Sequence, residues 1–200
     1  MIKKTFSVLV FALGAMALLT SCDKDDSTSP EGKTITIDAR SYSEWKYFSF
    51  DEDTIVPIDD FSTSMNWDIA FHRSDIRVNC GQAGLGQGGS YCVGKVDFKS
   101  VTEAPADGYS LNTTISILES YIMPPTYVTV PGDTLVSKWL TIVTSNTAPP
   151  TYVFNDNIYI IRTASGKYAK VWLKDYFDEN STGGYVQMMY SYQSDGSRSF

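Results

Sequence analysis

Three cysteines, six methionines and a single histidine supply most of the distinctive side-chain chemistry in this 200-residue sequence. Cys22 has the most specific context, because Leu19, Thr20 and Ser21 precede it at the end of an apolar stretch. This order is typical of the processing site of a bacterial lipoprotein, where the cysteine becomes the first mature residue. We therefore predict that Cys22 is lipidated, with a diacylglyceryl group on its thiol and an amide-linked acyl chain such as palmitate.

Residues 1–21 are predicted to be the lipoprotein signal peptide. Lys3 and Lys4 form its positive end. The apolar core from Val8 to Leu19 is shorter than the roughly 20 residues that a membrane-spanning helix needs. We therefore interpret this segment as an export signal and not as a membrane anchor.

Residues 22–33 are predicted to be a lipidated flexible tether. Residues 23–33 contain no apolar side chain, so burial cannot offset the entropy of ordering them. Two or more acyl chains are enough for stable attachment to a bilayer, so we expect the membrane to be contacted through the lipid. The folded domain is expected over residues 34–200.

The charge balance and the residue types exclude several functions. The net charge is −7, and removing a signal peptide that holds two lysines and no acid makes the mature chain more negative. Such a surface repels phosphate backbones, so we expect no nucleic acid partner. The chain has a single histidine and no recognisable Ser-His-Asp set. Asp175, Asp178 and Glu179 lie close together in the sequence, but they are predicted to lie in a turn exposed to solvent. We predict that the protein is not an enzyme.

Cys80 and Cys92 remain once Cys22 is lipidated. An even pair outside the cytosol favours a disulfide, so we predict a Cys80–Cys92 bond across a loop with five glycines. A phosphate-binding loop is disfavoured because no Gly-Lys-Ser/Thr follows the glycines. A zinc site is disfavoured because no further Cys or His pair lies nearby.

Alternation of apolar and polar residues with a period of two dominates the chain and predicts strands. The sequence therefore predicts an all-β fold, a single mainly antiparallel β-sandwich-like domain with long proline-rich loops. Residues 111–121 contain several β-branched side chains, which argue against a helix there. Nine strands are predicted, over residues 34–39, 44–50, 66–73, 75–79, 93–98, 139–143, 157–163, 168–174 and 185–193.

One five-residue phrase, Pro-Pro-Thr-Tyr-Val, occurs twice, at residues 124–128 and 149–153. Proline fixes φ and removes an amide donor, so the two phrases predict stiff corners. Rigid loops on a β scaffold are common positions for binding residues. We expect the functional residues near these two corners.

Several phrases resemble the family of HmuY-type haem-binding surface lipoproteins. They are residues 67–73, the glycine run after Asn79, residues 158–171 and residues 192–197. The resemblance implies an all-β domain that holds haem between two loops, with one axial ligand from each loop. The two loops correspond best to the two proline corners.

Met123 heads the first corner and Ala148 the second. A thioether is a soft donor that serves haem iron in cytochromes, so the resemblance makes Met123 the candidate metal ligand. Ala148 has no donor atom. The second axial position is then left to Tyr127, Tyr152, water or a second protein, or stays open. Haem-binding side chains are expected to be Met123, Tyr121, Tyr127, Trp139 and Tyr152.

The other candidate ligands are assigned to structural roles. His72 lies in the family phrase and not in a haem loop, so we expect a hydrogen-bonded structural histidine. Met65, Met188 and Met189 lie in or beside strands, where methionine commonly fills irregular gaps.

The resemblance implies a haemophore-like lipoprotein that delivers haem to a TonB-dependent outer-membrane transporter for iron acquisition. Residues 23–26 resemble the acidic tag that sends lipoproteins of this group to the outer surface. We therefore expect a lipid-anchored protein of the outer membrane that faces the cell exterior. The alternative is a non-haem binding or adhesion module of the same fold, with a glycan or protein ligand and no visible absorbance on mixing with haemin.

Overall fold

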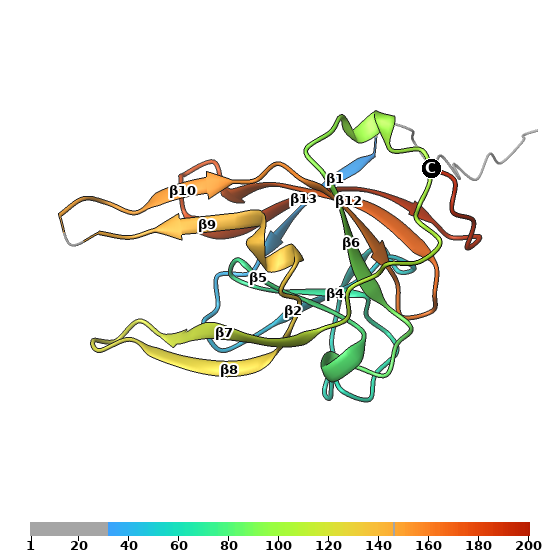
Figure 1. The fold of residues 1–200 in the computed structure, drawn as a ribbon. Coiled ribbons are helices and arrows are strands. Elements are labelled where there is room, and N and C mark those ends of the chain that lie inside the picture. Colours follow the sequence, from blue (N-terminus) through green and yellow to red (C-terminus); the bar gives the residue numbers. More distant parts are fainter. Residues whose placement is uncertain (1–31, 146) are drawn as a thin grey trace, which may run out of the picture.

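The computed structural model describes residues 32–145 and 147–200, so the predicted signal peptide, Cys22 and nearly all of the predicted tether lie outside the described residues. A five-stranded antiparallel sheet has the order β1-β13-β12-β11-β6 (Figure 1). Its strands are β1 (Lys33–Asp38), β13 (Gly183–Gln193), β12 (Tyr168–Phe177), β11 (Ile158–Arg162) and β6 (Gly89–Gly94).

The second sheet has four antiparallel strands in the order β3-β2-β4-β5. They are β2 (Lys46–Ser49), β3 (Thr54–Val56), β4 (Ile69–His72) and β5 (Asp75–Val78). Two further hairpins pair β7 (Thr113–Ser120) with β8 (Thr126–Gly132) and β9 (Leu140–Val143) with β10 (Thr151–Phe154). Three short 3-10 helices are η1 (Gly81–Ala83), η2 (Phe98–Ser100) and η3 (Val136–Trp139), and the described residues contain no α-helix.

The main core fills the space between the two sheets. Val186 and Met188 face it from β13, and Phe48, Ile69 and Phe71 face it from the second sheet, each at most 1% exposed. The neighbouring residues of β13 are less buried, as the alternation in the sequence predicts. The predicted all-β, mainly antiparallel sandwich is confirmed.

The strand predictions differ from the structure where proline and glycine occur. The sequence does not predict β3, β7, β8 or β10. β8 and β10 begin at Thr126 and Thr151, directly after the two proline pairs, so each repeated phrase opens a returning strand. β6 begins at Gly89 and not at the predicted Val93, because Gly89, the last glycine of the glycine-rich segment, and the three residues after it pair with β11.

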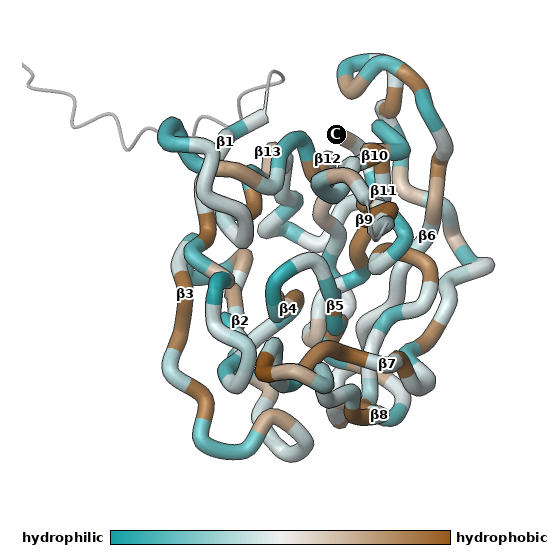
Figure 2. Tube along the Cα trace, turned by 90° about the vertical axis from the view of Figure 1, so that its left-hand side faces the viewer, coloured by the Kyte–Doolittle hydropathy of each residue, from teal (hydrophilic) through white to brown (hydrophobic). Residues whose placement is uncertain are grey.

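Both hairpins extend from the same side of the sandwich (Figure 1). Figure 2 views the molecule from that side, with β7 and β8 at the bottom, β9 and β10 in the upper part and β4 and β5 between them. The hairpin β7–β8 is hereafter the first hairpin and β9–β10 the second hairpin.

The edge strand β5 and the turn before it hold both hairpins. The Asp133 N–H that follows β8 donates to the Ile76 carbonyl at 2.8 Å. Arg77 Nε donates to the Pro131 carbonyl of β8 at 2.9 Å. On the other side, Trp139 Nε1 donates to the Ser74 carbonyl at 2.9 Å. β5 and its turn are therefore the common base of the two hairpins.

A buried carboxylate joins the two sheets. Asp68 is 5% exposed, and its two oxygens accept hydrogen bonds from the backbone N–H groups of Phe50 and Ala164 at 2.8 and 2.9 Å. Phe50 follows β2, whereas Ala164 lies in the β11–β12 turn. Asp68 thus satisfies donors from both sheets at once.

We expect Asp68→Ala to lower the free energy of unfolding by about 3 kcal/mol, because two buried N–H groups lose their acceptors. Asp68→Asn keeps one acceptor oxygen and should lose less. Urea unfolding followed by tryptophan fluorescence measures both. Asp195→Ala removes an exposed carboxylate that bonds only within its own turn, and it should leave the unfolding midpoint nearly unchanged. A loss for Asp68→Ala no larger than for Asp195→Ala would contradict this role.

Candidate functional site

The tip of the first hairpin exposes a thioether and aromatic rings. Met123 is 80% exposed, Ile122 81% and Tyr121 67%. The Ser120 hydroxyl accepts a hydrogen bond from the Ile122 N–H at 3.2 Å, and the Met123–Pro124 peptide bond is cis. Tyr127, at the start of β8, is 61% exposed. The Met123 sulfur therefore stands outside the core and can reach a ligand.

The tip of the second hairpin is closed by a serine. Ser145 Oγ accepts a hydrogen bond from the Ala148 N–H at 2.9 Å, which shapes the turn before the second proline pair. Ala148 is exposed and its methyl side chain offers no donor atom. Ala148, the residue that precedes the second proline pair, therefore supplies no metal ligand from its side chain.

One face of the second hairpin continues the core outward. Leu140 and Phe154 are paired at its base and pack in or against the main core. Ile142 and Tyr152 are the next pair on the same face, further from the sandwich. Ile142 is 39% exposed, whereas Tyr152 packs against rings of β12. We call Tyr121, Met123, Tyr127, Ile142 and Tyr152 the hairpin site.

A chain of ring contacts joins the two hairpins. The Tyr121 ring lies 6.1 Å from that of Tyr42, and the Arg73 guanidinium lies 4.2 Å above the Tyr42 ring. Arg73 is also 5.8 Å from the Tyr176 ring, which stacks on Tyr152 at 5.9 Å. We call Tyr42, Arg73 and Tyr176 the basal cluster, and it lies between Tyr121 of the first hairpin and Tyr152 of the second.

The structure separates the five residues predicted to bind haem. Tyr121, Met123 and Tyr127 are exposed on the first hairpin, and Tyr152 is half-buried on the second. Trp139 is 1% exposed at the start of the second hairpin and packs against Tyr176. Trp139 therefore supports the second hairpin from below, and a ligand would meet it only through its neighbours.

The sequence interpretation missed the basal cluster. Arg73 is the last residue of the family phrase at residues 67–73, and this position is the one feature of the sequence that could have indicated a functional role. Tyr42 and Tyr176 stand in no motif, so the sequence does not distinguish them from other tyrosines. The cluster supplies a cation and phenol groups next to exposed apolar side chains. This combination suits a flat apolar ligand that has an acidic edge.

The remaining histidine and methionines divide as follows. His72 is 1% exposed, with Nδ1 3.4 Å from Asp75 and its ring 5.3 Å from Trp45, a geometry that agrees with a structural role. Met188 is fully buried, as predicted. Met65 is 47% exposed, so the prediction that it packs in the interior is wrong.

The predicted Cys80–Cys92 disulfide is wrong, because both thiols are free. Hydrogen bonds order the glycine-rich segment between them instead. The Gly86 N–H donates to Asn79 Oδ1 at 3.1 Å, and the Gly88 N–H donates to the Asn79 carbonyl at 3.2 Å. A Cβ at either glycine would lie 2.5 Å from the Asn79 carbonyl oxygen, so this close packing requires glycine.

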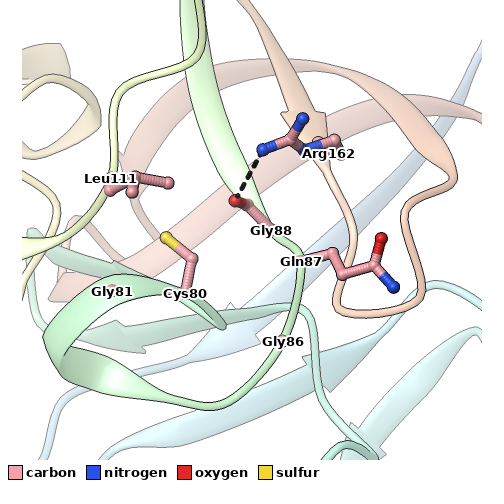
Figure 3. A pocket seen from close by; sticks show the side chains of 7 residues that line it. All are labelled: Cys80, Gly81, Gly86, Gln87, Gly88, Leu111 and Arg162. Atoms are coloured by element: carbon pink, nitrogen blue, oxygen red, sulfur yellow. Dashed lines mark hydrogen bonds between the residues drawn. The ribbon is translucent and has the colours of Figure 1, made fainter.

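A pocket of about 360 Å³ lies beside the buried Cys80 (Figure 3). Arg162 donates a long hydrogen bond to the Gly88 carbonyl at 3.4 Å across one of its walls. No aromatic ring lines it, so it does not suit a flat macrocycle. The lining residues are Cys80, Gly81, Gly86, Gln87, Gly88, Leu111 and Arg162.

The fold is an antiparallel β-sandwich from which two hairpins extend on the same side. The HmuY family model matches residues 41–190, and the chain therefore belongs to the HmuY family. This family is haem-binding and non-enzymatic, which supports a haem-binding protein at the level of the family. No curated protein matches the chain.

Solved structures agree with this assignment. A protein of Bacteroides vulgatus assigned as HmuY-like and haem-binding has 26% identity and a TM-score of 0.67, covering 82% of this chain and 92% of that one. The apo HmuY analogue of Tannerella forsythia has 22% identity and a TM-score of 0.65, with 81% and 95% covered. A Bacteroides fragilis protein assigned as a lipoprotein has 21% identity and a TM-score of 0.66, with 82% and 90% covered. The last two show the shared fold.

Within residues 32–145 and 147–200, no helix has the length and apolarity needed to cross a bilayer.

We expect alkylation to find two free thiols in the mature chain without reductant. Burial raises the pKa of the Cys80 thiol to about 11, so iodoacetamide at pH 8 should label Cys92 in the folded protein and leave Cys80 nearly unmodified. In urea both should be labelled. Peptide mass spectrometry with and without prior reduction reads the result, and a Cys80–Cys92 peptide seen only before reduction would contradict the structure.

Proposed function

We propose that this protein captures haem between its two hairpins, with the Met123 thioether as an axial ligand from the first hairpin. The observation that carries the proposal is the exposure of Met123, 80% at the tip of a braced hairpin. Met188, by contrast, is fully buried in the main core, where its sulfur cannot reach a ligand. Family membership supports haem as the ligand.

The spacing of the hairpins supports a flat ligand. The first hairpin is bonded to the second sheet through β5, whereas the second hairpin packs on β12 of the first sheet. Packed sheets lie about 10 Å apart, a distance that admits a planar ring with a side chain on either face. Apolar contact at about 25 cal/mol per Å² then adds several kcal/mol to the binding of a macrocycle.

The two hairpin tips would differ in what they offer to haem iron. Met123 supplies a soft sulfur on one side, whereas Ala148 supplies nothing on the other. Of the two tyrosines considered for that position, Tyr127 is the freer, because Tyr152 is held between Tyr176 and Phe177. Coordination through one protein ligand favours release as well as capture.

A role in delivery is consistent with the position of the chain start. Lys33 opens β1 at the end that pairs with Tyr190, whereas Asp38 pairs with Tyr185 near the hairpin side (Figure 1). A lipid at Cys22 would thus hold the domain from the end opposite the hairpin tips. We infer that the tips face away from the outer membrane surface and pass haem to a TonB-dependent transporter.

Titration of haemin into the mature protein tests the proposal. We expect a Soret band that shifts on binding, and tighter binding after reduction with dithionite, because thioether ligation favours ferrous iron. Met123→Ala should weaken ferrous binding by about tenfold or more and alter the visible bands, since a ligand to iron is lost.

Met65→Ala is the matched control, because it removes an exposed methionine that lies outside both hairpins. It should behave as the wild type. Identical ferrous spectra for wild type and Met123→Ala would exclude Met123 as the ligand. No Soret shift in any protein would refute haem capture and favour a surface module that binds a glycan or a protein through its exposed tips.

A further inference from the structure

Arg73 has an unusual backbone conformation for its residue type. It lies in the turn between β4 and β5 with a φ of 53°. Residues other than glycine seldom adopt this left-handed region, and such strain is often kept at functional positions. Its backbone N–H donates to the Ala39 carbonyl at 2.8 Å, which holds the turn. The conformation directs the guanidinium onto the Tyr42 ring, between the two hairpins.

The charge of Arg73 has no acidic partner. One nitrogen donates to the Arg40 carbonyl at 2.8 Å. Within residues 32–145 and 147–200, no carboxylate forms an ion pair with it. A guanidinium carries five N–H donors, so most of them remain available for an oxygen acceptor.

Tyr176 is an orphan donor beside this cation. The residue is 1% exposed, yet its hydroxyl has no hydrogen-bond partner in the part of the chain that the structure describes. Buried phenol groups usually find a partner. Burial raises the pKa of Tyr176 to about 12 although the nearby Arg73 guanidinium opposes the rise, so the hydroxyl keeps its proton and can donate it. A buried donor beside an unpaired cation indicates an acceptor that arrives with the ligand.

Both groups lie between residues of the two hairpins. Tyr42 links Arg73 to Tyr121 of the first hairpin, and the Tyr176 ring stacks on Tyr152 of the second. A ligand held at the hairpin site would therefore have one edge toward Arg73 and Tyr176. The mature chain is strongly acidic, so an unpaired cation at this base is selective for a negative edge.

We propose that Arg73 and the Tyr176 hydroxyl together bind a free carboxylate on the edge of the planar ligand, so that the site selects porphyrins with unesterified acid groups. This inference rests on the proposed haem capture. The guanidinium supplies charge-assisted hydrogen bonds, and the phenol supplies one further donor. The Met123 sulfur and this base then contact different parts of one ligand, the iron and the acidic edge.

Equilibrium titration of haemin and haemin dimethyl ester, in the same dilute detergent, tests the proposal. The ester keeps the ring and the iron and loses both negative charges. We expect the wild type to bind haemin about tenfold more tightly than the ester. In Tyr176→Phe and Arg73→Gln this preference should fall to roughly twofold, because the lost interaction is one that only the free acid makes. Arg73→Lys keeps the charge and should retain part of the preference.

Tyr168→Phe is the matched control, because it removes a phenol oxygen from the other end of β12, where Tyr168 packs against Tyr109. It should keep the full preference. Tyr176→Phe should also unfold at the same urea concentration as the wild type or a higher one, since an orphan hydroxyl contributes no bond to the free protein.

The outcomes separate the two proposals. Haemin and its ester binding the wild type equally well would overturn the carboxylate site and leave haem capture standing. A preference that survives in both Tyr176→Phe and Arg73→Gln would also overturn it. Failure of both ligands to bind the wild type would refute the proposed function itself.

Discussion

The edge of β5 is the constraint on which the rest of the structure depends. An edge strand exposes unpaired backbone groups, and here the segment after β8 covers them. The Ile76 carbonyl accepts from the Asp133 N–H, and the Ile76 N–H donates to the Ser137 hydroxyl at 2.9 Å. Since this segment links the first hairpin to the second, one edge sets the position of both. The functional geometry is therefore fixed by backbone hydrogen bonds far from either tip.

Arg77 reinforces this arrangement at an energetic cost. It is 2% exposed, and burial lowers the pKa of its guanidinium. The side chain lies 4.0 Å from the rings of both Trp45 and Phe61, and Tyr47 accepts one of its hydrogen bonds at 3.0 Å. Aromatic faces offset part of the lost hydration, and the Pro131 carbonyl of β8 accepts the hydrogen bond from Arg77 Nε. Arg77 thus bonds β5 to β8 at the point where the first hairpin leaves the sandwich.

Local patterns in the sequence predict much of the fold but little of the site. Alternation finds the strands that face the core, such as β13, because burial on one face imposes a period of two. The same rule misses β8 and β10, whose side chains are largely exposed.

The site depends on contacts between distant residues, which local patterns do not predict. Nothing in the sequence around Trp139 indicates that its indole N–H donates to the Ser74 carbonyl and that the ring is buried. Arg73 and Tyr176 are separated by about a hundred residues, so only the folded chain brings them together. The disulfide prediction was wrong because it relied on the even number of cysteines. That number does not indicate whether hydrogen bonds can order the glycine-rich segment without a disulfide.

The asymmetry between the two tips gives the basal cluster its importance. A site with a donor on each hairpin could hold iron from both faces, and its affinity would depend little on the periphery of the ring. In the proposed site Ala148 supplies no second donor, so we expect other parts of the ligand to contribute more to its retention. Apolar contact holds any flat macrocycle and distinguishes poorly among them. Polar groups left unpaired when the wrong ligand binds discriminate far better, and Arg73 and Tyr176 are such groups. In the proposed site, selectivity would then depend on the acidic edge of the ligand more than on the iron, because Arg73 and Tyr176 stand ready to bind that edge.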